Sequence, residues 1–372
     1  MKEGWTYKSF EDYLLKAAKA KQVQTSDYNS GSQYPIISQE DKMISGYCDD
    51  ASLLYHIDTP IVIFGDHTRV LKYVDFDFVV GADGVKILIP KDFLKAKYMF
   101  YYLRWYNVPS LGYSRHYKLL KEITLPVPPL SILQSIVSEL DMLSGLIAKH
   151  EEQLKAYDEL AQSIFYDMFG DPVENEKGWD YYELSEIYKF IDYRGKTPNK
   201  TTDGVPLITA KNIRKGNIDY SVDEYISESE HKNRLTRGIP RKGDLLFTTE
   251  APLGNAAIAD IDYYATAQRL IVLQRKDKVL LHNIYVLYYI LSDTFQEELL
   301  KNATGSTIKG IKASKLEKLK IPLPPLSLQT LFAEKIEAIE RQKERIRQSI
   351  AEVKTLFDSR MDYYFNSDTP LL

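Results

Sequence analysis

The sequence is poor in cysteine and in long apolar segments. Its 372 residues include a single cysteine, Cys48, so the chain can form neither an internal disulfide bond nor a metal cage of cysteine ligands. The strongest apolar run, IYVLYYIL at 284–291, is too short to span a bilayer, and the start MKEGWTYKSF lacks the apolar core of a signal peptide. We therefore expect a cytoplasmic protein with no membrane partner.

Motifs of nucleotide-dependent, metal-dependent and nucleophilic enzymes are also missing. The sequence contains no GxxxxGK[ST], GxGxxG, HExxH or GxSxG motif, and no Asn-Pro-Pro-aromatic motif of an amino-methyltransferase. GDHTR at 65–69 groups an aspartate, a histidine and an arginine, but no third catalytic partner is identifiable, which favours a ligand-contacting loop. We expect no catalytic residue, no metal site and no cofactor in this chain.

Charge is balanced overall but unevenly distributed. The formal net charge is -4 and the pI is near 6.0, which by itself argues mildly against free duplex DNA as a partner. Two stretches are nevertheless basic, 193–215 and 301–320, each with six Lys or Arg against one acidic residue. Basic side chains interleaved with Ser, Thr, Asn and Gly suit phosphate contacts, although a solvated protein face is the simpler interpretation of charge alone.

One proline-rich motif occurs twice. LPVPPLS at 125–131 returns as IPLPPLS at 321–327, and the same shift of 196 residues aligns Leu160 with Leu356 and Phe169 with Phe365. A shorter GWxY echo starts at residues 4 and 178. The chain therefore consists of two half-units, each with a globular region, the proline motif and a long segment that follows it.

The segments after both proline motifs have the 4,3 spacing of a coiled coil. The apolar seam positions are Ile136, Leu140, Leu143, Ile147, Leu154, Tyr157 and Ile164, and then Phe332, Ile336, Ile339, Ile346, Ile350, Val353 and Phe357. Each helix of about 38 residues would be roughly 57 Å long. So narrow a seam needs a partner helix, and the nearest is its own repeat; the alternative is packing of each helix on its own globular domain.

Polar residues interrupt the seam at His150, Lys343 and Arg360. We expect them to set the register or to reach solvent rather than to bind a metal. The proline motif itself predicts a stiff, polyproline-like strap, followed by Ser131 or Ser327 as the helix N-cap. Docking of this motif on an aromatic groove is the alternative.

The globular regions mix strands and helices, which predicts an α/β or α+β fold in each. Strands are expected within 34–38, 60–80, 85–90, 205–213, 242–258 and 269–274, and helices at 95–106 and 283–301. The two regions show no obvious similarity to each other inside. Expected boundaries are 1–130 for the first globular domain, 131–170 for the first long helix, 171–326 for the second domain, 327–366 for the second helix and 367–372 for a tail.

At this point the motifs resemble a known family, the specificity (S) subunits of type I restriction–modification systems. The resemblance is clearest in the second half, in the segments VPLITAKNIRKGNID, RKGDLLFTTEAPLGNAAI and GSTIKGIKASKLEKLKIPLPPLSLQ. In the first half, YPIIS, GDHTR and LKEITLPVPPLS are similar to the family. The resemblance covers essentially the whole chain. It departs from the family after PPLS, where a Glu-Gln pair is common and only Gln134 or Gln329 remains here. The first domain lacks counterparts of TAKNI and TTEAPLG.

The resemblance implies a DNA-recognition subunit without catalytic activity. Each globular region would be a target recognition domain for one half of a split sequence in double-stranded DNA, and the antiparallel helices would set the spacer. Two methyltransferase (M) subunits, carrying S-adenosylmethionine, would dock on the helices, and two motor-nuclease (R) subunits would join for restriction, with ATP and Mg on those partners. A non-DNA helical adaptor and a stand-alone nuclease or methyltransferase are the alternatives.

Candidate DNA contacts come from the loops of both globular regions. They are His67, Thr68, Arg69, Ser114, Arg115 and His116 in the first, and Arg194, Lys196, Lys211, Asn212, Arg214, Thr249, Thr307 and Lys309 in the second. The sequence leaves open which of them would contact bases and which phosphates.

Overall fold

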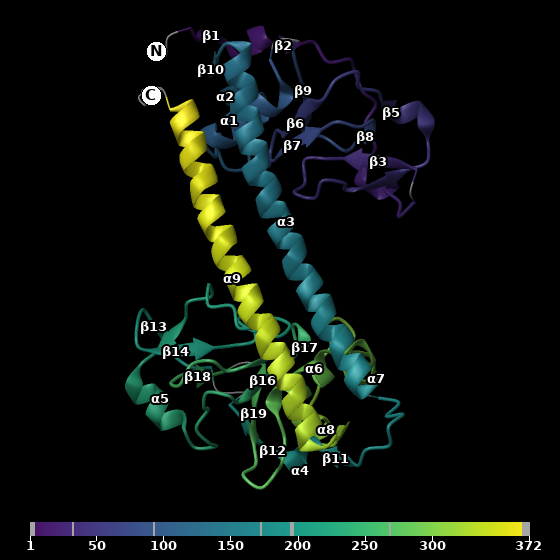
Figure 1. Ribbon diagram of the computed structural model, residues 1–372, viewed down its shortest axis with the longest axis vertical. Helices are drawn as coiled ribbons and strands as arrows, with labels where there is room; N and C mark the ends of the chain where they lie inside the picture. The colour runs from purple at the N-terminus through teal and green to yellow at the C-terminus, as the bar shows by residue number, and fades with distance from the viewer. Residues whose placement is uncertain are drawn as a thin grey trace. The chain divides into compact units, whose positions relative to one another are not determined.

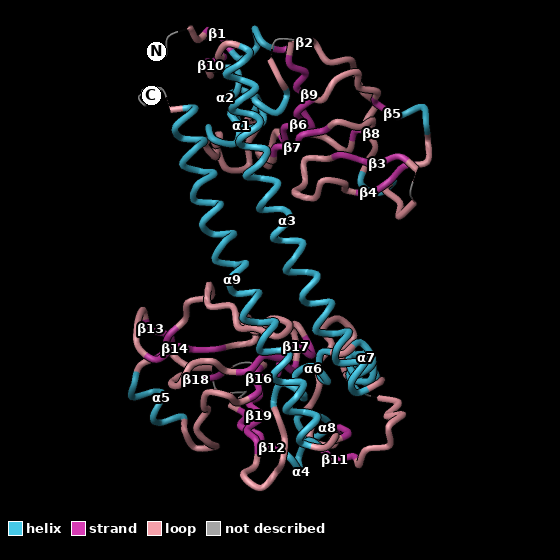
Figure 2. Tube along the Cα trace, viewed as in Figure 1, coloured by secondary structure: helices cyan, strands magenta, loops and turns pink. Residues whose placement is uncertain are grey.

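In the computed structural model the chain divides into two compact units. Unit 1 comprises Met1–Glu152 and Arg347–Leu372, and unit 2 comprises Gln153–Ile346. The structure describes residues 4–31, 33–91, 94–171, 173–193, 197–267 and 269–366. In each unit the strands and short helices form a globular domain, and parts of two long helices complete the unit (Figures 1 and 2).

The globular domain of unit 1 is built on two four-stranded sheets. The first has the order β2 (Leu14–Leu15), β9 (Val85–Pro90), β6 (Ile61–Gly65) and β7 (Leu71–Val74). The second has the order β4 (Gly46–Cys48), β3 (Tyr34–Ile37), β8 (Phe78–Val80) and β5 (Leu54–Tyr55). Helix α1 (Ala96–Tyr106) packs on the first sheet, and α2 (Tyr117–Lys121) follows it; short 3₁₀ turns are η1 (Phe10–Tyr13), η2 (Thr25–Asp27) and η3 (Ala51–Leu53).

The globular domain of unit 2 also has two four-stranded sheets. The first has the order β12 (Tyr188–Asp192), β19 (Leu270–Arg275), β16 (Leu245–Thr249) and β17 (Leu253–Ile258). The second has the order β13 (Lys200–Thr201), β15 (Tyr225–Ile226), β14 (Val205–Ile208) and β18 (Ala265–Thr266). The helices are α4 (Leu184–Ile187), α5 (Glu228–Arg234), α6 (Asn283–Leu291), α7 (Asp293–Asn302) and α8 (Ala313–Leu316), of which α6 packs on β17.

The two domains share the arrangement of their core strands, although their sequences show little likeness; they differ in the outer strand of the second sheet, which is β5 beside β8 in unit 1 and β13 beside β15 in unit 2. Each first sheet places its long central strands, β9 and β6 or β19 and β16, antiparallel at the centre. Each second sheet contains one parallel pair, β3 with β8 and β14 with β18. The likeness between the two regions is therefore greater in fold than in sequence, as the predicted internal repeat requires. The shared feature is a pattern of buried strands, which many apolar sequences satisfy, while the connecting loops differ freely.

The two sequence echoes meet in the structure. Strand β1 (Thr6–Ser9) pairs with β10 (Thr124–Val127), and β11 (Tyr181–Glu183) pairs with β20 (Lys320–Pro322), both antiparallel. Tyr7 of the first GWxY echo lies opposite Pro126, and Tyr181 of the second lies opposite Pro322, in the same register. The start of each proline motif is thus a strand in a two-stranded sheet, where a missing N–H is tolerated, a pairing that the prediction of a stiff, polyproline-like strap did not include.

Two tyrosines of a neighbouring helix donate hydrogen bonds to the backbone of each proline-motif strand. In α1, Tyr98 donates a hydrogen bond to the Pro126 carbonyl (2.7 Å) and Tyr102 donates to that of Thr124 (3.1 Å). In α6, the equivalent pair donates to Pro322 and Lys320: Tyr285 (2.7 Å) and Tyr289 (3.0 Å). Burial raises the pKa of Tyr102 to about 12, so its hydroxyl remains a donor at neutral pH. The underlying YxxYY repeat, at 98–102 and 285–289, is a likeness between the domains that the sequence analysis overlooked.

Each proline motif leads into a long helix. Helices α3 (Leu130–Phe169) and α9 (Leu326–Phe365) contain 40 residues each. The amide of Leu133 donates to the Pro129 carbonyl (3.0 Å) and that of Gln329 donates to the Pro325 carbonyl (3.2 Å), so these prolines occupy the N-cap positions. The prediction of serine N-caps was wrong by two residues. A proline there loses nothing, because the first amides of a helix have no partner within the helix.

The two long helices run antiparallel in both units. Every predicted seam residue is buried or half-buried. In unit 1, Arg360 near the end of α9 pairs with Glu139 near the start of α3 (Nε–Oε1 2.5 Å). In unit 2, Lys343 of α9 pairs with Asp158 of α3 (2.6 Å). Both polar seam cations therefore face an acidic residue of the partner helix, which fixes the register in the way expected of such positions.

The structure also bears on the requirements of a metal site and of a membrane span. Within the described ranges, no group of three or more His, Cys, Asp or Glu side chains could hold a metal ion.

By length and composition alone, α3 contains an 18-residue stretch that is apolar enough to cross a membrane, with a mean hydropathy of 1.4. A paired amphipathic helix of this length meets the same criterion, and α3 is paired with α9 in both units.

The helix predicted at 283–301 is two helices. Ser292 has an extended backbone (φ -64, ψ 144) and separates α6 from α7. Its hydroxyl accepts a hydrogen bond from the amide of Phe295, which makes it the N-cap of α7. The prediction of one helix was wrong because the apolar pattern continues across a residue that prefers to cap.

Candidate nucleic-acid interface

Three loops come together at one edge of the sheets in each unit. In unit 1 they follow β3, connect β6 to β7, and precede α2. In unit 2 they follow β14, connect β16 to β17, and precede α8. A backbone hydrogen bond joins two of the three loops in each unit: the His116 amide donates to the Asp66 carbonyl (2.8 Å), and the Ile311 amide donates to that of Thr249 (2.9 Å). The shared fold thus places the candidate loops of both domains at equivalent positions.

In unit 1, a buried histidine fixes the loop that precedes α2. His116 is buried; its Nδ1 lies 2.9 Å from the Asp66 carbonyl, and its Nε2 accepts a hydrogen bond from the Leu111 amide (2.9 Å). These contacts require the proton on Nδ1, so the ring is the neutral tautomer that bridges two loops. The buried Asp66 carboxylate accepts from the Tyr117 amide (2.7 Å) and lies 3.5 Å from the ammonium of Lys86. His116 therefore positions the loop.

Two other candidates in unit 1 are bound to neighbouring loops. Thr68 donates its hydroxyl to the Gln39 carbonyl (2.6 Å). Arg69 has a left-handed backbone (φ 64) and donates to the Val108 carbonyl (2.9 Å), so one end of its guanidinium is engaged. Both residues connect the β6–β7 turn to the loops on either side of it.

The groups presented by unit 1 are an aromatic pair and a cation. The His67 ring stacks on Tyr113, with centroids 5.9 Å apart, and Tyr113 is fully exposed. Ser114 is half-buried beside it, and Arg115 is exposed. Arg115 makes no hydrogen bond or ion pair with any residue in the described part of the chain, so its guanidinium is available to a ligand.

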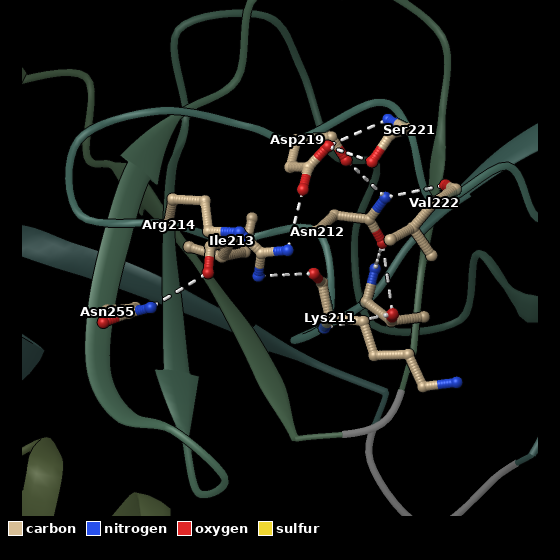
Figure 3. A network of polar contacts seen from close by, with 9 residues as sticks. Lys211, Asn212, Ile213, Arg214, Asp219, Ser221, Val222 and Asn255 are labelled. Carbon is tan, nitrogen blue, oxygen red and sulfur yellow. Dashed lines mark hydrogen bonds and ion pairs between the residues drawn. The ribbon is translucent and has the colours of Figure 1, made fainter. Parts of the chain in front are cut away.

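In unit 2, Asn212 is the centre of a polar network (Figure 3). Its carbonyl oxygen accepts from the amide (3.0 Å) and hydroxyl (3.2 Å) of Thr209, and its amide nitrogen donates to the carbonyls of Asp219 (3.1 Å) and Val222 (3.0 Å). Asn212 is buried, and its side-chain amide accepts two hydrogen bonds and donates two within the protein. It therefore holds the loop after β14 in shape.

The neighbouring cations, Arg214 and Lys211, differ in how tightly they are bound to other residues of the protein. Arg214 donates to the Lys211 carbonyl (2.8 Å) and pairs with Asp219 (2.7 Å), as Figure 3 shows. Hydrogen bonds from Ser221 hold the pKa of Asp219 below its ordinary value, so this carboxylate is ionised at neutral pH. Lys211 is 68% exposed, and its ammonium lies 3.6 Å from Glu224, a distance that leaves it able to reach a phosphate.

The three loops of unit 2 enclose a groove of about 800 Å³. Lys211 and Thr249 line it, but Thr249 is buried and its hydroxyl donates to the Arg269 carbonyl (3.2 Å). Arg269, which the sequence analysis did not select, also lines the groove, and its Nε lies 2.8 Å from Glu250. Lys312 lines it too. Lys312 lies within the basic stretch 301–320, whereas Arg269 is an isolated cation immediately before β19, and no sequence pattern marked it.

The loop before α8 presents two candidates directly. Thr307 and Lys309 are exposed, and neither has a polar contact with the residues that the structure describes. Both lie between Thr304 and Gly310, whose backbones exchange two hydrogen bonds (2.8 and 2.9 Å). Arg194 and Lys196, the remaining candidates, lie outside the described residues.

Comparison with protein families finds a match over most of the chain. Residues 2–156 and 176–355 match the family model described as type I restriction modification DNA specificity domain. The EcoR124I/EcoR124II specificity subunit of Escherichia coli is 26% identical over 368 residues, covering 92% of this chain and 88% of the relative. The putative MjaX specificity subunit of Methanocaldococcus jannaschii is 26% identical over 288 residues, covering 70% of this chain and 64% of the relative.

Two solved structures have the same fold. One is the S subunit of a type I restriction-modification system from M. genitalium, with a TM-score of 0.59 at 13% identity, covering 98% of this chain and 97% of that chain. The other comes from work on complex assembly and conformational transition of the type I R-M system, with a TM-score of 0.55 at 17% identity and 98% coverage of both chains.

Proposed function

Since the chain belongs to the type I restriction modification DNA specificity family, we propose that it is the DNA sequence-recognition subunit of a type I restriction–modification complex. The observation that carries this proposal is the repetition of one loop cluster on two domains with the same arrangement of core strands. Two equivalent clusters suit a target with two half-sites. Each domain reads one half, and the paired helices α3 and α9 set the spacer between the halves.

Recognition divides between residues that hold the loops and residues that face DNA. His116 and Asn212 are buried and hold their loops. Arg115, Lys211 and Lys309 are exposed and provide the cations. In a major groove, such side chains reach base edges or phosphates, and the latter contacts fix the register of the protein on the duplex.

The methyltransferase subunits dock on the long helices. Only 17% of the apolar stretch of α3 is buried inside this chain, so much of its surface is available to a partner. Leu160 of α3 and Leu356 of α9 are equivalent under the internal repeat and are 45% and 49% exposed. Equivalent apolar positions suit two copies of one M subunit, and two R subunits join for restriction. S-adenosylmethionine, ATP and Mg belong to these partners in the cytoplasm, and this chain has no catalytic role.

Binding to DNA tests the proposal. The chain assembled with its M subunits should bind a specific duplex with an affinity that falls steeply as salt rises, because lysines and arginines displace counterions from phosphates. Lys309→Ala should lower affinity and reduce the salt slope by about 1 if this lysine contacts a phosphate. Lys335→Ala, on an exposed face of α9, is the matched control and should change neither. Salt-insensitive assembly without DNA binding would favour a protein adaptor instead.

A further inference from the structure

The groove of unit 2 has one large exposed aliphatic side chain among lining residues that are mostly polar or small. Ile308 lines the groove and is 53% exposed, between the exposed residues Thr307 and Lys309. Ile311, the other isoleucine of the lining, is buried. Leaving about half of an isoleucine in water forgoes part of the stabilisation that full burial of such a side chain provides.

The position of Ile308 is set by the backbone of its loop. Thr304 and Gly310 close the loop with two hydrogen bonds, and Ile311 bonds to the end of β16 (2.9 Å). Gly305 has a φ of 104, and a Cβ at this residue would lie 2.1 Å from the Ile308 carbonyl oxygen. Only glycine allows this close approach. The loop therefore presents Ile308 in one preformed position, which lowers the ordering cost of a contact.

The equivalent loop of unit 1 also presents an apolar group beside a cation. Tyr113 is fully exposed there, two residues before the exposed Arg115. The loop is anchored by His116, just as Gly310 and Ile311 anchor its counterpart. Both recognition loops thus combine a projecting hydrophobic side chain with a free cation.

We propose that Ile308 recognises thymine, by packing against its C5-methyl group in the major groove, while Lys309 and Thr307 engage polar or phosphate oxygens beside it. The thymine methyl is the apolar feature that distinguishes base pairs in the major groove. This assignment rests on the proposed function, that the second domain reads DNA, and adds a base class and a residue to it.

Thymine and uracil differ only by this methyl group, so duplexes with single uracil substitutions test the assignment. Once the half-site of the second domain is known, each thymine in it is replaced in turn by uracil, and binding to the assembled complex is measured by fluorescence anisotropy. One substitution should weaken binding of the unmodified protein about fourfold, the effect of one methyl group leaving an apolar contact. Ile308→Ala should bind thymine and uracil duplexes equally at that position.

A matched control is Ile239→Ala, which removes an isoleucine of the same 53% exposure that is not among the groove-lining residues. This variant should retain the full thymine preference. Equal binding of all uracil duplexes by the unmodified protein would overturn the assignment, as would an Ile308→Ala variant that still prefers thymine. A uniform loss of affinity in Ile308→Ala, without a change in methyl preference, would also overturn it and indicate a wedge between bases. Failure of the unmodified complex to bind any specific duplex would refute the proposed function itself.

Discussion

At the scale of single residues, the recognition loops contain two kinds of side chain. Some form hydrogen bonds within the protein, and others are exposed and form none among the described residues. The sequence marks both kinds alike, because Arg115 and His116 are neighbours of similar polarity. Their roles diverge only in the fold, where a residue 50 positions away, Asp66, supplies the carbonyl that His116 contacts. Long-range partners of this kind leave no local pattern in one sequence. The positions of the loops could be predicted from their Gly, polar and basic composition. Which of their side chains hold the loop in shape and which face a ligand could not be predicted.

His116→Ala should destabilise unit 1, because it removes a buried ring that bridges two loops. The Leu111 amide loses its acceptor, and the Asp66 carbonyl keeps only the hydrogen bond from the backbone amide of residue 116. We expect a loss of about 1–3 kcal/mol in the free energy of unfolding, the cost of an unsatisfied buried polar group. Urea denaturation followed by circular dichroism measures it. A variant as stable as the unmodified protein would contradict the positioning role.

Arg115→Ala should have the opposite profile. Its guanidinium is exposed and free, so the free energy of unfolding should change by less than about 0.5 kcal/mol. Binding of the assembled complex to its target should weaken by about 1–3 kcal/mol if Arg115 reads a base, with relaxed preference at one position of the first half-site. Lys149→Ala, an exposed lysine on α3, is the control for a general loss of positive charge. Unchanged affinity and preference would remove Arg115 from the interface.

At the scale of secondary-structure elements, the helix pair is the part that the sequence predicts best. A 4,3 spacing repeated over two segments identifies the face of each helix, and this periodicity is a local property. The proline motif was less predictable, since its partner strands β1 and β11 come from more than 100 residues earlier in the chain. Ser292 shows a third case, in which one capping side chain interrupts an apolar pattern that would otherwise read as a single helix.

The register of the helices should depend on the Arg360–Glu139 pair. Arg360→Glu places two carboxylates together at a half-buried site, and we expect a loss of about 1–3 kcal/mol in unfolding free energy. Adding Glu139→Arg reverses the pair and should restore much of that loss. A double-mutant cycle on thermal or urea unfolding gives the coupling. Additive effects of the two substitutions would show that the contact does not contribute.

The same pair should make stability depend on acid pH. Hydrogen bonding to Arg360 holds the pKa of Glu139 below its ordinary value of 4.5. A carboxylate with a lowered pKa in the folded state stabilises the fold fully above its unfolded pKa, and this contribution is lost as the pH falls through the folded value. Glu139→Gln should therefore be less stable than the unmodified protein at pH 7, with a gap that narrows below pH 4.5.

Glu152→Gln is the control for this pH dependence, because Glu152 is exposed on the same helix and has no ion pair among the described residues. Its stability should follow that of the unmodified protein at every pH. A gap for Glu139→Gln that persists unchanged at pH 3 would mean that the substitution acts through packing rather than through the charge of Glu139.

At the scale of the whole molecule, the chain is a repeat whose two halves share a fold and differ in their loops. The sequence reveals the repeat through PxPPLS, GWxY and the helix period, but it conceals the common topology of the domains. The strands that define this topology need only be apolar and of the right length, so their residues can differ, whereas the tyrosine pairs of α1 and α6 meet specific carbonyls and recur. A repeat of this kind accounts for a subunit that recognises two different half-sites with one architecture.

The most direct test of this account is a genome-wide map of N6-methyladenine in cells that carry the complex with either the unmodified chain or a chimera. In the chimera, residues 171–326 are replaced by the corresponding domain of a relative with a different target. The account predicts a split motif in which one block and the spacer are retained while the other block changes to that of the donor. If both blocks change together, or if the motif is the same with and without the exchange, the two domains do not read separate halves of the target and the central claim is wrong.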